Sequence, residues 1–390
     1  MATVKNRVAL ILAVGIVGGG ELGKVPIALP VLSGDFGLSL VEGGLLLGMF
    51  QVALMAAGIV AGMMADRFGQ RRVMAIGLVI AAIGSALGAM AGSGAQLLAS
   101  RAVESAGFMA MVLPGPALLG RMVDSRRLRA TMGLWACYMP TGMGLVLLLG
   151  PIVIDAVGWR ALWWAFTLLP LGLAALVWHR VEPDQPHRTG ADGEHRAAPL
   201  VIATLTCPGC WLLAGAFACY AGQWMSVFGF LPTFYRGQGL TSATAGLLTA
   251  IGALVNVTGN FGSGLLLQRG IAAHRLLLLA SLTMLACAWI LFGSGLPFAA
   301  RYAAVLAFSA VGGLIPGTLF ALTHRYAPTP QAVSTTTGLM QQGSSTGQFI
   351  IPPVLAAVVS TAGGWSLAWT VTGALALVNI GLALTMRRRA

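Results

Sequence analysis

The sequence predicts an all-α membrane protein of twelve transmembrane helices in two pseudo-symmetric six-helix bundles. Three observations support this class. Hydrophobic residues make up 57% of the 390 residues and charged residues only 9%, whereas about 25% of the residues in a soluble domain are charged. Apolar segments long enough to cross a hydrocarbon layer about 30 Å thick recur along the chain. The second half of the chain also repeats features of the first.

The apolar segments define the predicted helices in order. The spans are 8–31, 40–64, 73–92, 96–119, 129–154, 160–178, 202–229, 242–267, 274–294, 299–322, 332–359 and 366–385. The short basic segment at the start resembles the beginning of a signal peptide. The apolar segment that follows it continues to Val31 and has a counterpart later in the chain, which favours a first membrane span.

The positions of the basic residues predict the topology. Most of the 23 Lys and Arg residues fall in loops on one side of the predicted bundle, and the exceptions are Lys24, Arg101, Arg160, Arg236 and Arg301. Because cytoplasmic loops carry an excess of Lys and Arg, both termini are predicted to be cytoplasmic, with the protein in the cell inner (plasma) membrane. The net charge of +12 is then a topology signal, and no nucleic-acid partner is expected.

An internal repeat predicts the domain organisation. Leu29-Pro30 recurs as Leu231-Pro232, and Gly37 recurs as Gly239, both at an offset of 202 residues. The polar segment between the halves contains three prolines and few apolar residues, which is typical of a flexible linker. The predicted domains are therefore an N-terminal six-helix bundle (1–179), a cytoplasmic linker (180–199) and a C-terminal six-helix bundle (200–390).

A dense group of charges separates the second and third predicted spans. Its pattern, G-x-x-x-D-R-x-G-x-R-R from Gly62 to Arg72, resembles the signature loop between the second and third helices of the major facilitator superfamily. Together with the repeat, the resemblance covers nearly the whole chain. Gly69 suits a turn that needs a positive φ, and Gly62 would let two helices approach closely. The alternative, an ordinary positive-inside turn, leaves the glycines and the acid unexplained.

The resemblance implies alternating access and a cytoplasmic gate. In the family, the loop aspartate lies against the start of the eleventh helix when the cytoplasmic side is closed, so Asp66 is expected near the unpaired amides of residues 333–335. Gln70 stands where the family usually has a basic residue, so a pairing of the loop with Asp124 must use Arg67 or Arg71. The predicted gate residues are Gly62, Asp66, Arg67, Gly69, Arg71, Arg72 and Asp124.

Two further family motifs match in part. The segment from Arg101 to Gly107 resembles the fourth-helix pattern R-x-x-Q-G-x-G, with Glu104 in place of the glutamine. The antiporter pattern of the fifth helix places a pair of glycines after Gly-Pro, and these glycines are missing after Gly150-Pro151. The second departure weakens an efflux function without excluding it.

Charges inside the predicted spans are candidates for a substrate or proton site. Glu21 and Lys24 are three residues apart on the first helix and share a face, as do Arg101 and Glu104 on the fourth. Each costs about 2.5–3.5 kcal/mol at the centre of a helix unless it is paired or faces water. The two pairs lie at similar predicted depths, so they are expected to form one neutral cluster. It would be either a substrate or proton site, with Glu21 as the acid nearest the midplane, or a static brace.

The C-terminal half offers only neutral polar groups. The last of the 11 acids is Glu194, and Gln223 stands 202 residues after Glu21. Aromatic side chains of the fifth helix could extend the same surface, although membrane aromatics more often serve as packing or interface anchors. The predicted cavity residues are Trp135, Tyr138, Tyr220, Gln223, Trp224, Asn256, Gln341 and Gln342.

Two segments resemble motifs of soluble enzymes, but neither has the residues or the structural context that the motif requires. The segment Gly18–Val25 nearly matches a phosphate-binding loop, but Val25 replaces the required Ser or Thr and no strand precedes it. Cys207-Pro-Gly-Cys210 has thioredoxin-like spacing, yet it opens a membrane helix outside any βαβ unit. No second cysteine pair completes a metal site. The sequence therefore predicts no enzyme, no metal and no cofactor, with a proton gradient as the driving force.

These features predict a secondary active transporter that moves a small organic solute, with an organic anion as one option. Proton-coupled uptake by alternating access is the favoured mechanism, and proton-driven efflux is the alternative. A membrane receptor or sensor with a transporter fold is a third option, which the short linker disfavours. The expected partners are a small-molecule substrate and the lipid bilayer, and the chain is expected to work as a monomer.

Overall fold

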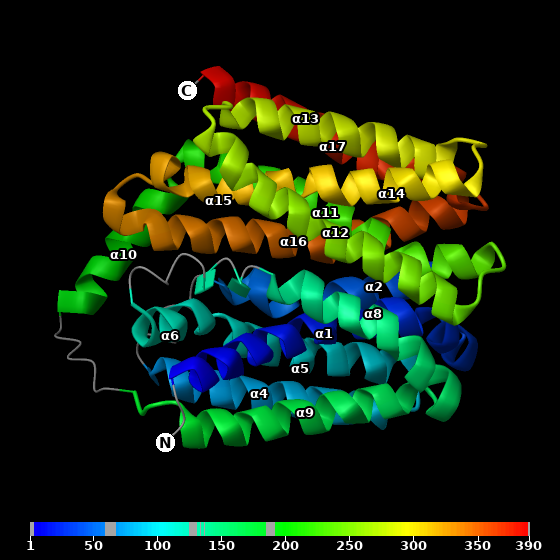
Figure 1. Ribbon diagram of the computed structural model, residues 1–390, viewed down its shortest axis with the longest axis horizontal. Coiled ribbons are helices and arrows are strands. Elements are labelled where there is room, and N and C mark those ends of the chain that lie inside the picture. Colours follow the sequence, from blue (N-terminus) through cyan, green and yellow to red (C-terminus); the bar gives the residue numbers. More distant parts are fainter. Residues whose placement is uncertain are drawn as a thin grey trace. The chain divides into compact units, whose positions relative to one another are not determined.

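The computed structural model describes residues 4–58, 68–124, 131–132, 134–135, 137–184 and 192–388. Within these ranges every regular element is a helix (Figure 1). The first half contains α1 (Val4–Phe36), α2 (Leu40–Met49), α4 (Gln70–Ala89), α5 (Gly94–Val112), α6 (Gly115–Met122), α8 (Tyr138–Val157) and α9 (Trp159–Arg180). Each of these helices lies at a predicted span.

The second half follows the same plan, except that its first helix begins at Asp192, so residues 192–199 of the predicted flexible linker are helical. Its helices are α10 (Asp192–Leu205), α11 (Pro208–Gly237), α12 (Ser242–Gln268), α13 (Ala273–Ala288), α14 (Phe298–Gly312), α15 (Leu314–Tyr326), α16 (Val333–Thr361) and α17 (Ala368–Arg388). Three short elements join them, namely η1 (Trp289–Gly293), η2 (Pro330–Ala332) and η3 (Trp365–Leu367).

The predicted membrane class is confirmed, but the count of twelve spans is not. In the described part of the chain, nine helices are long and apolar enough to cross a membrane. The number rises to eleven if two bent pairs each count as one span, residues 40–49 with 52–58 and residues 199–206 with 208–237. α16 lies at the eleventh predicted span and has 29 residues, but it is not in this set. Its apolar sequence is interrupted by polar residues such as Gln341, Gln342 and Gln348.

Local sequence explains where several helices begin and end. Ser39 and Glu42 form a reciprocal capping box at the start of α2, which satisfies amides that have no partner within the helix. Ser93 accepts a hydrogen bond from the Gln96 amide at the start of α5. Gly37, which follows α1, has φ +62°, and its repeat partner Gly239, which follows α11, has φ +85°. The repeat is therefore visible in the backbone at this turn.

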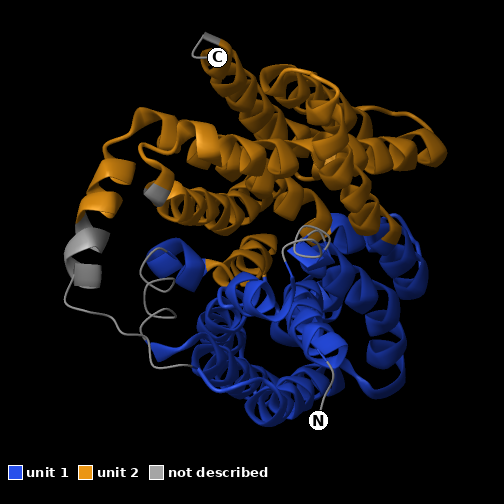
Figure 2. Ribbon diagram, turned by 60° about the vertical axis from the view of Figure 1, so that its left-hand side comes forward, with its two compact units in different colours: residues 1–38, 52–189, 231–250 blue, residues 39–51, 190–230, 251–390 orange. Residues whose placement is uncertain are grey.

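The helices form two compact units that exchange segments between the sequence halves (Figure 2). Unit 1 contains residues 1–38, 52–189 and 231–250, and unit 2 contains residues 39–51, 190–230 and 251–390. The division into bundles at residues 179 and 200 follows from the repeat and stays a prediction, since these units group segments by packing.

Close helix approach organises the inside of each unit. In unit 1, α1 packs on α8 and α4 packs on α5 and α9, and in unit 2, α2 packs on α16. A Cβ atom added at Gly48 would lie 2.5 Å from the carbonyl oxygen of Phe349, and one added at Gly44 would lie 2.7 Å from Cα of Pro353. Small residues at such contacts let helix backbones approach each other in lipid.

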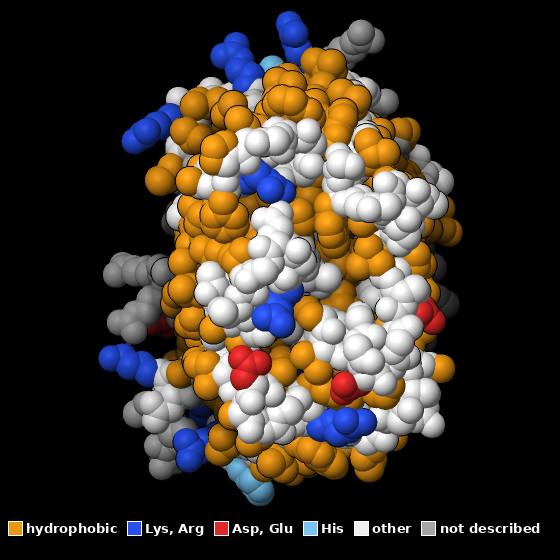
Figure 3. Space-filling model, turned by 90° about the vertical axis from the view of Figure 1, so that its right-hand side faces the viewer, with side chains coloured by type: hydrophobic (Ala, Val, Ile, Leu, Met, Phe, Trp, Pro, Cys, Tyr) orange, Lys and Arg blue, Asp and Glu red, His pale blue; other side chains and the backbone are white. Residues whose placement is uncertain are grey.

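The outer surfaces suit a hydrocarbon environment. Exposed Ile76, Ile83 and Leu87 follow one another at helical spacing on α4, and Leu145, Leu148 and Ile152 do the same on α8. Figure 3 instead looks at the ends of the helices, where a few Lys, Arg, Asp and Glu side chains lie among hydrophobic ones. Apolar side chains facing outward are expected of helices whose surroundings are lipid.

A matched pair of glycine substitutions tests the α1–α8 contact. A Cβ added at Gly142 on α8 would clash with the backbone of α1, whereas one added at Gly172 on α9 would meet no atom within 4 Å. Gly142→Ala should therefore lower the melting temperature in detergent. Gly172→Ala should leave it unchanged or raise it, because Ala is the better helix former by about 0.8–1 kcal/mol. Equal melting temperatures for the two variants would contradict the described approach of α1 and α8.

Candidate functional site

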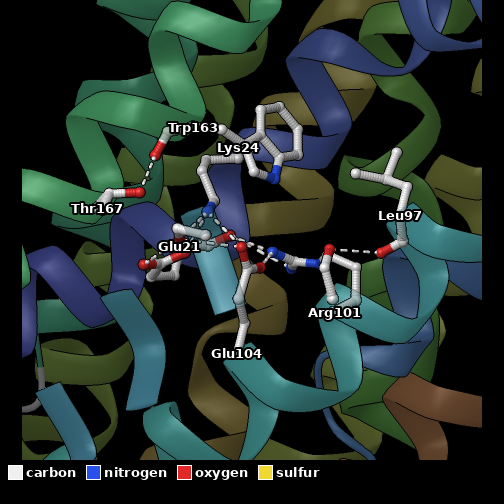
Figure 4. A network of polar contacts seen from close by, with 9 residues as sticks. Glu21, Lys24, Leu97, Arg101, Glu104, Trp163 and Thr167 are labelled. Atoms are coloured by element: carbon white, nitrogen blue, oxygen red, sulfur yellow. Dashed lines mark hydrogen bonds and ion pairs between the residues drawn. The ribbon is translucent and has the colours of Figure 1, made fainter. Parts of the chain in front are cut away.

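The predicted charge cluster is present inside unit 1 (Figure 4). The Lys24 ammonium lies 2.5 Å from Glu21 Oε2 and 2.8 Å from Glu104 Oε1. Arg101 pairs with the other oxygen of Glu104, and its guanidinium donates to the backbone carbonyl of Glu21 at 3.3 Å. α1 and α5 thus each contribute one acid and one base, at the i, i+3 spacing that the sequence shows.

Ser85 of α4 is a fifth member that the sequence did not reveal. Its hydroxyl lies 2.8 Å from Lys24 Nζ, 2.9 Å from Glu104 Oε1 and 3.2 Å from Glu21 Oε1. The hydroxyl can donate to one carboxylate while it accepts from the ammonium. It therefore joins the two acids of the cluster, and it does so from a third helix.

Aromatic rings of α9 cover the remaining side of Lys24. Its ammonium lies 5.0 Å from the ring centre of Trp163 and 5.1 Å from that of Phe166. A cation over an aromatic face is stabilised by the negative charge of the ring face, more strongly when water is excluded. Nothing in the spacing of α9 predicted this contact, since Trp163 and Phe166 look like ordinary membrane aromatics.

The cluster is sealed from solvent. Glu21, Lys24, Arg101 and Glu104 are each at most 1% exposed, and Ser85 is fully buried. Two acids balance two bases, so the cluster is neutral when all four groups are charged. In this arrangement it ties α1, α4 and α5 together, and a change of one proton would leave an unbalanced charge inside unit 1.

A neutral polar group is present in unit 2. Asn256 of α12 donates to the hydroxyl of Tyr220 at 2.9 Å and to the backbone carbonyl of Ser309 at 2.9 Å. Trp224 Nε1 lies 3.5 Å from the hydroxyl of Ser309, and Asn260 donates to Asn256 Oδ1 at 2.8 Å. Three of the predicted cavity residues, Tyr220, Trp224 and Asn256, therefore belong to one hydrogen-bonded group.

The other predicted cavity residues lie elsewhere in their units. Gln223 is fully buried and donates to the carbonyl of Cys219 on its own helix, while its Oε1 has no hydrogen-bond partner. Gln341 and Gln342 are half-buried on α16. In unit 1, the rings of Trp135 and Tyr138 lie 5.0 Å apart and pack against Gly15 of α1. That position is typical of packing aromatics.

Gln51 forms a second buried amide group in unit 2 that the sequence did not reveal. Gln51 lies at the break between residues 40–49 and 52–58, which are bent by 43°. Its amide donates to Gln348 Oε1 at 3.2 Å and accepts from the Ser345 hydroxyl at 3.1 Å. Gln348 also donates to Ser344 at 3.2 Å. Neutral side-chain hydrogen bonds therefore hold this break against α16.

The signature loop is only partly described. Gly62, Asp66 and Arg67 lie outside the described residues, so the expected contact of Asp66 with the start of α16 stays a prediction. Gly69 has φ +94°, as its place in the turn predicted. Beyond it, Asp184 accepts hydrogen bonds from the backbone amides of Arg71 (3.0 Å) and Arg72 (3.2 Å) at the start of α4. A carboxylate at a helix N-terminus is favourable, because the amides there are unpaired and carry partial positive charge.

The pairing of the loop with Asp124 through Arg67 or Arg71 stays a prediction, since Arg67 lies outside the described residues, but Arg71 has other partners. The Arg71 guanidinium donates to the carbonyl of Trp178 at 2.6 Å and stacks on its ring at 4.6 Å. Asp124 is exposed and forms no ion pair with any described arginine. Asp184 is the acid that contacts the start of α4, and it also lies 3.8 Å from Arg121. Asp184 follows α9 in the predicted linker, where sequence alone gives no reason to place it against α4.

Metal ligands do not gather in the described part of the chain. No three His, Cys, Asp or Glu side chains in it lie close enough together to hold a metal ion. Buried acids and bases are paired with each other, and the buried amides mostly bond to hydroxyls and carbonyls. The chemistry available is therefore charge balance, proton exchange and hydrogen bonding.

A protein-family model matches most of the chain. The Major Facilitator Superfamily model matches residues 10–352. The cyanate transport protein CynX of Escherichia coli K12 is 26% identical over 310 residues, which cover 77% of this chain and 76% of CynX. The tetracenomycin C resistance and export protein of Streptomyces glaucescens is 30% identical over 154 residues, which cover 39% of this chain and 28% of that protein.

Solved structures show the same fold. A bacterial homologue of the human lysosomal transporter Spinster, in an inward-facing and occupied conformation, has a TM-score of 0.77 at 16% identity, covering 98% of this chain and 97% of that one. A D-xylose-proton symporter has a TM-score of 0.75 at 14% identity, covering 99% of this chain and 97% of that one.

A charge-restoring double variant tests the cluster. Lys24→Met leaves two buried acids facing one base and should destabilise the protein by about 3–5 kcal/mol. Adding Glu21→Gln restores neutrality, so the double variant should regain more than half of that loss. Thermal unfolding in detergent measures both, with Lys5→Met at an exposed position as the control. A double variant less stable than Lys24→Met would contradict the described pairing.

Two glycine substitutions test the Asp184 contact. Gly69→Ala places a Cβ atom into the Asp184 carboxylate and strains a positive φ, whereas Gly270, with φ +83°, has open space around it. The strain alone costs about 1–2 kcal/mol. Gly69→Ala should therefore lower the melting temperature more than Gly270→Ala, and adding Asp184→Ala should shrink the difference. An unchanged difference in the Asp184→Ala background would remove Asp184 from this turn.

Proposed function

Because the chain belongs to the Major Facilitator Superfamily of membrane transporters, we propose that it moves a small organic anion into the cell together with a proton. The family predicted from the signature loop is thereby confirmed. The proposal places the protein in the inner membrane with both termini cytoplasmic. It acts as a monomer without a cofactor. The proton gradient supplies the driving force, and alternating access of its two halves carries the solute across.

The charge cluster of unit 1 is the observation that carries the proposal. Lys24 is shared between Glu21 and Glu104, at 2.5 Å and 2.8 Å. A proton on Glu21 leaves two bases facing one acid, so the sealed cluster gains one positive charge. A net positive charge in a low-dielectric interior attracts an anion over many ångströms. Proton uptake and anion uptake would thus favour each other, and the complex of both would be neutral.

Glu21 fits the proton-carrying role better than Glu104. Glu104 is held by Lys24, by Arg101 and by Ser85. Glu21 pairs with Lys24, and its contacts to Ser85 are longer, at 3.2 and 3.4 Å. More positive and donating partners stabilise the charged form of a carboxylate, so the less supported acid is the one to take up a proton.

The absence of acids in the second half supports an anionic substrate. No Asp or Glu occurs after Glu194, so no carboxylate there repels an anion. Tyr220, Trp224 and Asn256 offer neutral donors and aromatic surface in unit 2. The likeness to a cyanate transport protein over three-quarters of both chains agrees with a small anion.

Proton-driven efflux is the second candidate. It is favoured by the 30% identity to a resistance and export protein, although that match covers only 28% of the relative. The missing glycines after Gly150-Pro151 weigh against it. Reversing the pH gradient distinguishes the two directions in one preparation.

Reconstituted vesicles test the proposal. Uptake of labelled cyanate, formate, acetate and benzoate is measured with the inside made alkaline, and again without a gradient. With the gradient, at least one anion should accumulate above its level in protein-free vesicles, which weak acids enter passively as neutral molecules, while neutral sugars should not. Glu21→Gln should abolish the protein-dependent accumulation but retain exchange of anion across the membrane, because glutamine keeps the positive charge of the protonated cluster and cannot release a proton. Undiminished accumulation by Glu21→Gln would reject the coupling role, and accumulation with the reversed gradient would favour efflux.

A further inference from the structure

Cys207 and Cys210 meet at a sharp break in the chain. The helical segments 199–206 and 208–237 are bent by 71°, and Cys207 is the residue between them. Pro208 begins α11, and the amide of Cys210 donates to the carbonyl of Cys207 at 3.1 Å. This turn holds the two cysteines at the start of one helix. Side chains three residues apart on a helix have Cβ atoms about 5–6 Å apart. A disulfide needs about 3.5–4.5 Å, so the turn at Cys207, which precedes the helix, must close by about 1–2 Å.

Both thiols point at the same acceptor. The Sγ atoms of Cys207 and Cys210 each lie 3.6 Å from the backbone carbonyl oxygen of Tyr326, and they also contact each other. Cys210 Sγ lies 3.5 Å from the Thr336 hydroxyl. Cys210 is buried, whereas Cys207 is partly exposed. The sulfur of Cys207 is therefore accessible to a small oxidant, and it contacts the buried sulfur of Cys210.

The acceptor belongs to the connection that leads into α16. Tyr326 is the last residue of α15, and its carbonyl is among those that a helix end leaves without a partner. Its ring packs on Gly209, between the two cysteines, and its hydroxyl donates to the carbonyl of Met386 on α17 at 3.4 Å. Thr336 lies in the first turn of α16. The dithiol therefore contacts the end of α15 and the start of α16.

We propose that Cys207 and Cys210 form a reversible redox pair, oxidised by hydroperoxides, whose disulfide loosens the start of α16. The thiolate of Cys207 attacks one oxygen of hydrogen peroxide, which gives a sulfenic acid and hydroxide. The thiolate of Cys210 then displaces hydroxide from that sulfur and closes the S–S bond. The two thiol protons convert the two hydroxides to water. Two electrons pass from the sulfurs to the O–O bond, and a cellular dithiol reverses the reaction by exchange.

The disulfide has a structural consequence, because it removes two donors. Neither sulfur can then donate to the partly buried Tyr326 carbonyl or to Thr336, and the loss of these hydrogen bonds weakens the contact with the start of α16. The predicted cytoplasmic position would keep the pair reduced at rest, so oxidation would act as a temporary signal. Among the described cysteines, this spacing on one helix start is found only at residues 207 and 210.

Mass spectrometry of the full-length protein tests the pair. The purified protein is treated with hydrogen peroxide, its free thiols are alkylated, and the peptide containing both cysteines is compared with those of Cys219 and Cys287. The 207–210 peptide should lose two hydrogens, escape alkylation and recover both changes after dithiothreitol. Cys207→Ser and Cys210→Ser should each prevent the loss, and Cys219→Ser should not. A stable sulfonic acid at Cys207 with Cys210 still alkylated would overturn the pair.

Hydrogen exchange tests the link to α16. In the oxidised wild type, amides of residues 326–340 should exchange several-fold faster than in the reduced protein, and dithiothreitol should restore the slow rate. Cys210→Ser treated with peroxide should show no change. A disulfide that forms without altered exchange would overturn the effect on α16. Neither readout uses a transported solute, so the results are independent of the proposed anion uptake.

Discussion

The ion pairs of Lys24 with Glu21 and Glu104 fix the geometry on which unit 1 depends. Inside hydrocarbon, a charge cannot be solvated by water, so each of the four ions needs its counter-ion within the protein. Satisfying both acids at 2.5 Å and 2.8 Å sets the rotation and the depth of α1 relative to α5. Ser85 then places α4 against both, and Trp163 closes the site from α9. Four helices are thereby held by one buried group.

The membrane spans and the pairing of the four charges could be predicted from the sequence. Hydropathy locates the spans, and the i, i+3 spacing of Glu21 with Lys24 and of Arg101 with Glu104 predicts paired charges at matching depth. Ser85 could not be predicted, because serine is common in membrane helices and the sequence does not show which face of α4 turns inward. Asp184 was missed for a related reason, since its role depends on where a loop returns in space. Gln51 lies at a helix break that no proline marks.

The two sequence halves share a backbone plan but not a chemistry. Gly37 and Gly239 adopt the same positive φ at corresponding turns. Within the helices that end at these turns, the corresponding positions differ, since Glu21 pairs with a buried lysine whereas Gln223 bonds to its own helix. Duplication fixes turns and spans through local geometry. Side-chain roles are free to diverge, because each depends on neighbours contributed by other helices.

The contact of α2 with α16 relies on weaker forces than the charge cluster. Gly44 and Gly48 let the backbones approach, and Gln51 bonds with Gln348 and Ser345 through neutral groups. Neutral side-chain hydrogen bonds between membrane helices contribute only about 0.6 kcal/mol each on average. Breaking a buried ion pair by removing one partner costs about 3–5 kcal/mol. Neutral hydrogen bonds of this strength can break and form again at ordinary temperature, whereas the buried ion pairs of the charge cluster persist. Polar residues on α16 lower its hydropathy, and the hydrogen bonds that they supply to Gln51 are of the weaker, exchangeable kind.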